Sequence, residues 1–267
     1  MRLSRIAKAG LVYYCSPRLA DVGVPHAFPT RQGGVSPEPF ASLNLGSTIT
    51  PTLSDDPTNV RENYRRLLAA LGCEDRQWVY VHQVHGSAVA DARAHASFEC
   101  GQYADAIVSD DPGRVVTVRT ADCVPILLAD RTGRAVAAVH AGWRGIIAGT
   151  LLAAIARVSE HFDVASGNLL AAIGPCIGPE AFEVGPEVLA EFATAFGADA
   201  PIRAAANGKG FVDLCAAVFR QLKSAGVPAD CIDGGDHCTV RDVEEFFSHR
   251  RDAGRTGRMA AAIGARR

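Results

Sequence analysis

Two residues that commonly bind metal ions stand at the ends of a predicted β-hairpin. In TADCVPILLADRTGRAVAAVHAGWRG, residues 120–145, Cys123 precedes the first apolar run and His140 closes the second. Asp130 and Gly133 suit the outer positions of a type I turn between the runs. With the turn centred between them, Cys123 and His140 become direct cross-strand partners on one face, about 5 Å apart at Cβ. A glycine bulge at Gly133 would shift this pairing by one residue.

A third ligand is expected from the segment HQVHG, residues 82–86. His82 and His85 stand three residues apart, so in a strand they point to opposite faces and only one of them joins the site. His85 is the better positioned because it directly precedes a glycine. One cysteine and two histidines suit zinc, and three protein ligands leave a fourth position for water, as in catalytic zinc sites. A second interpretation makes Cys123 a nucleophile and His140 its base.

The hydrophobic pattern predicts the elements that must position these residues. Residues 56–72 have helical periodicity, with Asp56 or Thr58 as the N-terminal cap and Gly72 at the end. The two near-continuous apolar runs that flank the turn, 124–130 and 135–141, are typical of strands buried on both faces. Further strands are predicted over residues 77–86, 104–109, 114–120, 168–175, 244–252 and 257–264. Further helices are predicted over residues 143–161, 186–196 and 212–225.

The order of these elements indicates the fold class. Strands and helices are mixed without a strict strand–helix–strand alternation, which favours an α+β fold with helices outside buried sheets. No repeat or linker divides the chain, so we expect one domain over residues 1–267, with residues 1–23 at its periphery. Residues 1–25 look irregular apart from a short strand near 11–17. Residues 26–46, rich in Gly, Pro, Ser and Asn, predict a long loop of the kind that often carries function.

Composition argues against several classes of protein. The chain has 267 residues, 48% of them hydrophobic, and a net charge of −2, so it can form a sizeable core and has no basic footprint for nucleic acid. No run of about 18 apolar residues is present to span a membrane. The eight cysteines include no Cys-x-x-Cys pair, and the first residues do not resemble an export signal. We therefore expect reduced thiols in a cytoplasmic, monomeric protein.

From about residue 24 onward the chain resembles a known family. It is similar to the YfiH/YlmD family, also called the laccase-like multicopper polyphenol oxidase or peptidoglycan editing factor PgeF family, to which human FAMIN is related. HAGWRG together with TADCVP is nearly diagnostic, and Ala253 stands where the family more often has glycine. The blocks that carry the resemblance are TRQGGVSPEPFASLNLG, VHQVHG, ADAIVS, RTADCVPILLAD, AAVHAGWRG, IGPCIG and RRDAGRTGRMAAAIG.

The resemblance implies a fold, a metal site and a reaction. The fold is a single-domain, layered α–β–β–α sandwich, and the mononuclear zinc site maps onto His85, Cys123 and His140, which favours His85 over His82. The activity is phosphorolysis of adenosine, inosine, guanosine and methylthioadenosine, with adenosine deamination. Two rivals remain: a peptidoglycan editing hydrolase that uses the same zinc-bound water on UDP-MurNAc amino-acid precursors, and a non-catalytic metal-binding partner protein.

Two other metal chemistries fit the sequence poorly. A multicopper oxidase holds several copper ions, many of them through His-x-His pairs, whereas this chain has eight histidines and no His-x-His. A single copper ion is compatible with one thiolate and two imidazoles. The His-x-Glu and Pro-Cys-x-x-Cys signature of zinc deaminases is also absent. Deamination at zinc-bound water would therefore use a different architecture.

Phosphorolysis requires a bound phosphate, for which arginine is suited. The candidates are Arg31, Arg61 and Arg144. Arg144 follows His140 by four residues at a predicted helix N-terminus, whose free N–H groups attract anions. A solvated surface position is the simpler interpretation for Arg61.

Three further residues could support the site. Asn44, in the long loop, could hydrogen-bond a ribose or a base, or it could cap its own loop. Asp122 could orient a ligand or act as an acid or base. Cys176, in a glycine–proline turn, could lie near the site, although a packed thiol is the simpler interpretation.

Overall fold

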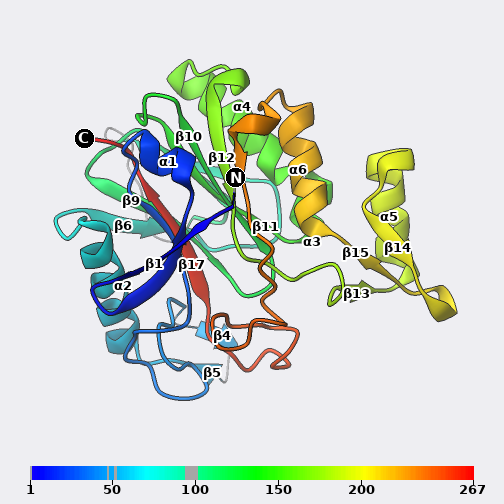
Figure 1. Ribbon diagram of the computed structural model, residues 1–267, viewed down its shortest axis with the longest axis horizontal. Coiled ribbons are helices and arrows are strands. Elements are labelled where there is room, and N and C mark those ends of the chain that lie inside the picture. Colours follow the sequence, from blue (N-terminus) through cyan, green and yellow to red (C-terminus); the bar gives the residue numbers. More distant parts are fainter. Residues whose placement is uncertain (1, 47, 51–52, 94–101) are drawn as a thin grey trace.

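The computed structural model describes the chain except for residues 1, 47, 51–52 and 94–101. His95 and Cys100 therefore lie outside the described residues. Two six-stranded sheets dominate the structure (Figure 1). The first contains, in spatial order, β1 (Ser4–Lys8), β2 (Leu11–Cys15), β3 (His26–Pro29), β17 (Met259–Gly264), β9 (Arg114–Thr120) and β6 (Gln77–Tyr80). The second contains β16 (Ile232–Asp233), β12 (Leu169–Ile173), β10 (Val124–Asp130), β11 (Val136–Ala141), β8 (Ala106–Ser109) and β7 (Val89–Asp91).

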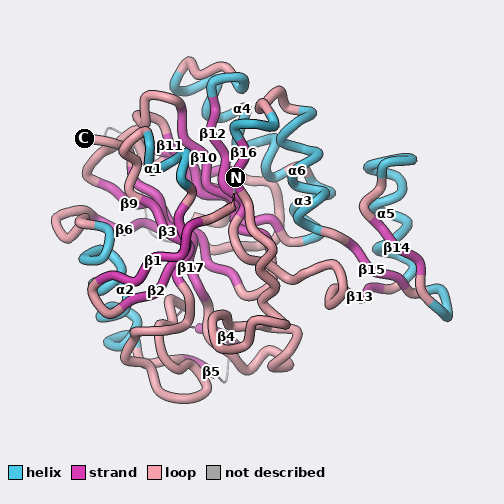
Figure 2. The backbone as a smooth tube through the Cα atoms, in the orientation of Figure 1, coloured by secondary structure: helices cyan, strands magenta, loops and turns pink. Residues whose placement is uncertain are grey.

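Helices cover the outer faces of the two sheets (Figure 2). The helix α2 (Pro57–Leu71) packs Val60, Tyr64 and Leu67 against the first sheet in a separate hydrophobic cluster. The second sheet is covered by α3 (Trp143–Ala148), α4 (Thr150–Phe162) and α6 (Leu214–Ser224). This arrangement confirms the expected layered α–β–β–α architecture. The shorter helical elements are α1 (Pro17–Asp21) and four 3-10 turns, Ser166–Asn168, Gly197–Asp199, Ala206–Gly208 and Ala229–Cys231.

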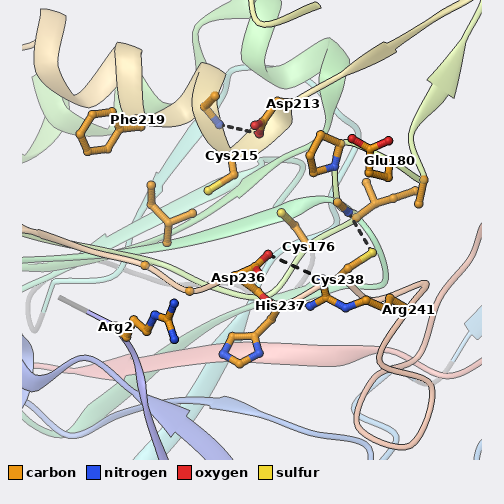
Figure 3. Close-up of a pocket in the computed structure, with 18 of the residues that line it drawn as sticks. Arg2, Cys176, Glu180, Asp213, Cys215, Phe219, Asp236, His237, Cys238 and Arg241 are labelled. Atoms are coloured by element: carbon orange, nitrogen blue, oxygen red, sulfur yellow. Dashed lines mark hydrogen bonds and ion pairs between the residues drawn. The ribbon is translucent and has the colours of Figure 1, made fainter. Parts of the chain in front are cut away.

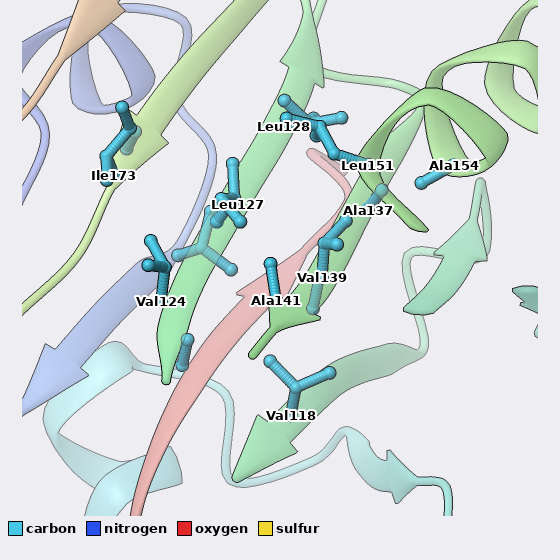
Figure 4. Close-up of a cluster of buried hydrophobic side chains, with 14 of the residues drawn as sticks. Val118, Val124, Leu127, Leu128, Ala137, Val139, Ala141, Leu151, Ala154 and Ile173 are labelled. Atoms are coloured by element: carbon cyan, nitrogen blue, oxygen red, sulfur yellow. The ribbon is translucent and has the colours of Figure 1, made fainter. Parts of the chain in front are cut away.

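The inner strands β10 and β11 are buried along their whole length. Pro125 lines a small space between the sheets together with Phe28 and Met259, so one face of β10 points to the first sheet. Because side chains alternate along a strand, Leu127 shares that face. Leu128 points the other way, toward Leu151 of α4 (Figure 4). The apolar runs are continuous because each strand has a hydrophobic layer on both sides.

A smaller unit projects from the body of the molecule (Figure 1). It is a three-stranded sheet, in the order β13 (Glu183–Val184), β15 (Gly210–Val212) and β14 (Ile202–Ala204), with the helix α5 (Pro186–Phe196) beside it. A short hairpin of β4 (Thr48–Thr50) and β5 (Leu53–Ser54) stands before α2.

Several predicted boundaries are confirmed and others shift. The helix α2 has Asp56 as its cap, accepting from the Thr58 N–H, and ends at Gly72 in the left-handed conformation. The predicted helix 143–161 is two helices, because Gly149 adopts φ 78° between them. The helix predicted over 186–196 coincides with α5, and that over 212–225 is α6.

Three expectations need correction. The strand predicted over 77–86 ends at Tyr80, and a loop that carries both histidines follows. Residues 244–252 form turns instead of a strand. Phe246 and Phe247 are buried from this loop, and its N–H groups bond within turns or to the side chains of Met259 and Asp122. The short strand expected near 11–17 is present as β2, but residues 1–25 are more regular than expected, since β1 precedes it and α1 follows it.

The long loop is shorter than predicted, because residues 26–29 form β3, and residues 30–46 lie against α2. Asn63 of α2 donates to the Ser36 hydroxyl at 2.9 Å and to the Asn44 carbonyl at 2.8 Å. The seven cysteines that the structure describes are free thiols. Among the described residues, no helix has the length and apolar character needed to cross a membrane.

Candidate metal centre

Three side chains that bind metals converge at one end of the inner strands. The ligand atoms of His85, Cys123 and His140 all lie within 4.8 Å of one another. The Cys123 Sγ is 3.9 Å from the His85 Nε2, and the two imidazole rings stand nearly perpendicular, at 82°. His140 is buried, Cys123 is half-buried and His85 is exposed. The cluster therefore has three donors and an accessible side, the arrangement that catalytic metal sites use.

The hairpin brings Cys123 and His140 together in a register different from the predicted one. Val124 pairs with Ala141, so the direct partner of His140 is Pro125, and the predicted pairing with Cys123 is wrong. The turn has the expected hydrogen bond from the Gly133 N–H to the Asp130 carbonyl. The two strands, however, begin to pair only outside this turn, where Asp130 bonds to Ala135. The error is two residues, which preserves the face of every side chain. Cys123 and His140 are thus diagonal neighbours.

Gly142 provides the space that the cluster occupies. It lies opposite Cys123 in the extended register of the hairpin. A Cβ at this position would be 2.9 Å from the Cys123 Sγ and 2.9 Å from the His85 Cδ2. Any larger residue would therefore displace two of the three donors.

His85 reaches the cluster from a tight turn after β6. Its backbone has φ 59°, a left-handed conformation that is uncommon outside glycine. The Asp105 carboxylate holds the turn by accepting the N–H groups of Val84, His85 and Gly86 at 2.8–3.1 Å. His82 instead forms a backbone bridge with Tyr103 outside the cluster.

Asp105 also orients His140. Its Oδ1 lies 2.9 Å from the His140 Nδ1, so the other ring nitrogen is left for the cluster. Burial by itself would raise the pKa of Asp105, but the bonds from His140 and the backbone lower it, so the carboxylate is charged. Sequence reasoning missed this residue. The sequence feature that could have indicated Asp105 is that it is the single carboxylate in the apolar segment ADAIVS.

The charges of the cluster favour a metal-binding thiolate. Burial alone would raise the pKa of Cys123, yet the neighbouring His140 and His85 lower it. Burial alone would lower the pKa of His140, and the Cys123 thiolate and Asp105 raise it instead. These pKa shifts favour a deprotonated Cys123 next to a protonated His140. A metal cation that binds here would take the place of that proton.

Arg258 is a second residue that sequence reasoning missed. Met259 pairs with Thr120, so the backbone of Arg258 lies next to the segment that carries Asp122 and Cys123. Burial lowers the pKa of the Arg258 guanidinium, while the charges of Asp122 and Cys123 oppose that effect. Its Nη1 donates only to backbone carbonyls, those of Thr256 and Gly257. Within the described parts of the chain no carboxylate forms an ion pair with Arg258. The sequence feature that could have indicated Arg258 is that it is the second arginine of the block RTGRM.

The side chains of Asp122 and Asn44 form hydrogen bonds that hold neighbouring segments of the chain in place. Asp122, with φ 98°, accepts from the Thr239 hydroxyl and from the Arg250 N–H, each at 2.6 Å. Asn44 is fully buried, caps its loop at Gly46, and accepts the Arg258 N–H at 2.9 Å. Asn44 thereby fixes the backbone of Arg258.

The three predicted arginines lie on different elements and have different local contacts. Arg144 is exposed on the six-residue α3, with its guanidinium 4.3 Å above the Trp143 ring. Arg61 is exposed on α2 and contacts the Thr58 hydroxyl. Arg31 bonds to the Ala41 carbonyl and covers the Phe247 ring. Cys176 is buried, and its pKa rises well above the usual range because of burial.

The fold and the site together define an α+β protein with a candidate three-ligand metal centre between two packed sheets. The chain belongs to the family described as multi-copper polyphenol oxidoreductase laccase, whose sequence model matches residues 25–266.

Curated relatives and solved structures agree with this membership. Purine nucleoside phosphorylase YfiH of Escherichia coli is 42% identical over 244 residues, which are 90% of this chain and 93% of that protein. Purine nucleoside phosphorylase PA4543 of Pseudomonas aeruginosa is 42% identical over 88% of this chain and 90% of its own. The crystal structure of YlmD from Geobacillus stearothermophilus has a TM-score of 0.88 at 33% identity and covers 99% of both chains. Neisseria meningitidis protein NMB0706 has a TM-score of 0.81 at 36% identity over 100% of both chains.

Proposed function

We propose that this protein is a zinc-dependent purine nucleoside phosphorylase. The observation that carries the proposal is the cluster of His85, Cys123 and His140, which has an orienting carboxylate behind His140 and one open side. A thiolate with two imidazoles is a donor set that suits zinc. The names of the relatives supply the reaction. The substrates we assign are adenosine, inosine, guanosine and methylthioadenosine.

A bound zinc would supply a Lewis acid and an activated water in its fourth position. Deamination of adenosine requires such a water, so we assign it as a second activity of the same centre. The family description names a multicopper enzyme, but this chain lacks the histidine ligands of a multicopper site, since it has eight histidines and no His-x-His. The donor cluster has the size of a single ion site.

The residues of the chain then have distinct tasks in phosphorolysis. A phosphate oxygen forms a bond to C1′, the bond from C1′ to N9 breaks, and the purine leaves and takes up a proton. We assign the phosphate to Arg258, whose backbone lies next to the Asp122–Cys123 segment and whose guanidinium has no carboxylate partner among the described residues. Asn44 positions Arg258 through its backbone N–H. Arg144 is a second phosphate candidate at the exposed entrance.

Two assays on one zinc-loaded preparation test this function. We expect hypoxanthine and ribose 1-phosphate from inosine only when phosphate is present, and inosine from adenosine without phosphate. Arg258→Gln should lower phosphorolysis at least about tenfold, the loss of one charge-assisted hydrogen bond, and affect deamination less. Arg65→Gln, which removes an exposed charge on α2, is the control.

The outcomes separate the alternatives. If Arg258→Gln left phosphate-dependent cleavage intact and Arg144→Gln abolished it, the phosphate role would pass to Arg144. If zinc-loaded wild-type protein gave neither product, the nucleoside function would be wrong. A UDP-MurNAc amino-acid precursor would then become the leading substrate.

A further inference from the structure

A large cavity lies beside α6, and none of the three proposed metal ligands lines it. Its volume is about 1010 Å³. It is bounded by the first turns of α6, the segment after β12 and the loop at 234–241 (Figure 3). The volume is at the upper end of the range for pockets that hold small organic molecules.

The walls of the cavity are largely apolar. Cys176, Cys215 and Cys238 reach it from three different segments (Figure 3). Burial raises the pKa of Cys176 and of Cys215, so both thiols are neutral and behave as apolar groups. Phe219 of α6 lines the same cavity and is 36% exposed, which leaves part of its ring open to a ligand.

Two cations at the cavity have no carboxylate partner among the described residues. Four carboxylates line it, and each has a hydrogen-bonding or ionic partner: Glu180 binds Arg203, Asp213 binds the Ala216 N–H, Asp233 binds Ser16 and Arg18, and Asp236 binds Arg241. In the described chain no carboxylate pairs with Arg220 or Lys223. The Arg220 Nη1 is buried and has no hydrogen-bond acceptor among the described residues. Arg220 and Lys223 lie three residues apart on one face of α6.

We propose that this cavity is a second ligand site, which binds an organic anion with a flat apolar body. The apolar part packs against Phe219 and the neutral thiols, and the anionic group accepts hydrogen bonds from Arg220 and Lys223. Such a ligand would satisfy the buried Arg220 nitrogen, for which the described part of the chain supplies no acceptor. The site does not depend on the metal centre or on the proposed reaction.

The probe for this site is 8-anilinonaphthalene-1-sulfonate, whose fluorescence rises in apolar surroundings. We expect saturable binding of one probe to the full chain. The double variant Arg220→Gln/Lys223→Gln should weaken it about tenfold, through loss of charge-assisted contacts. The matched control Lys8→Gln/Arg65→Gln removes equal charge from β1 and α2, outside the residues that line the cavity, and should not change the affinity. Cys123→Ala should also bind the probe normally.

A third variant tests the cavity without altering charge. Ala216→Trp places an indole among the lining residues and should abolish saturable binding. Urea unfolding of each variant shows that it is folded, which excludes binding to a loosened core. The proposal is overturned if wild-type protein shows no saturable binding, or if the charge variant binds as well as its control.

Discussion

At the scale of single residues, Asp105 links two of the three proposed ligands. It is fully buried, and its two oxygens accept three backbone N–H groups of the His85 turn and face the His140 ring. One carboxylate therefore sets the turn that carries one ligand and the ring orientation of the other. A carboxylate behind a metal-binding histidine also increases the basicity of the ring.

Replacing Asp105 should therefore weaken metal binding. Asp105→Asn keeps the size of the side chain but loses the charge and turns an acceptor into a donor. We expect the affinity for zinc to fall about 10- to 100-fold, as for other second-layer carboxylates. Competition with a chromophoric chelator measures it. Asp91→Asn, which alters the pair between Asp91 and His161 outside the cluster, is the matched control. Equal zinc affinity in both variants would remove Asp105 from the site.

At the scale of elements, the hairpin shows which predictions from sequence hold. The side-chain face has a period of two residues, so a register error of two still brought Cys123 and His140 together. The exact register of the two strands depended on Asp130. Its carboxylate accepts three N–H groups of the turn, and this makes the loop between the strands longer than predicted. The strand predicted around Phe246 failed because apolar residues can be buried from a loop as well as from a sheet.

The close approach at the end of the hairpin gives a second prediction. Gly142→Ala places a methyl group 2.9 Å from the Cys123 Sγ, so at least one donor must move. We expect substoichiometric zinc in the purified variant, measured by elemental analysis. Gly86→Ala is the control in the same site, since its nearest neighbour is 3.6 Å away. Full zinc occupancy in Gly142→Ala would contradict the proposed ligand set.

The strand β3 contributes a pH dependence of stability. Burial lowers the pKa of His26, whose Nε2 accepts the Ser16 N–H, while the charge of Asp233 opposes this effect only in part. Below about pH 6.5 the unfolded chain binds a proton at this residue before the native protein does. Native stability should therefore fall as the pH decreases through that value.

His26→Gln isolates this contribution, because a glutamine oxygen can accept the same N–H. Urea unfolding at about pH 7.5 and about pH 5.5 should show a smaller loss for the variant than for wild type. Identical losses in the two proteins would assign the pH dependence to other groups.

At the scale of the whole molecule, the packing of the two sheets fixes the fold. Leu127 of β10 is fully buried on the face that meets the first sheet. Leu127→Ala should lower the free energy of unfolding by about 2–5 kcal/mol, through lost burial and a cavity. Leu152→Ala, on α4 and 39% exposed, should cost much less. Urea unfolding compares the two, and equal costs would show that the interface between the sheets can collapse around the gap.

The distribution of the site over the chain explains what could be predicted from the sequence. The layers and the buried strands followed from periodicity, and Cys123 and His140 from one local hairpin. Asp105 and Arg258 were missed because they approach the cluster through tertiary contacts, from a segment before β8 and from the start of β17. No pattern local to either residue encodes those contacts.

The position of β17 has a consequence for the order in which the protein is made. Residues 259–264 form the strand that joins β3 to β9 in the middle of the first sheet. Until the ribosome has released these residues, the N-terminal half-sheet and the half-sheet of β9 and β6 have no hydrogen-bonded link. Arg258, which we place on the phosphate, is synthesised just before that link. The side of the site that we assign to the phosphate is thus completed only after this strand has been made.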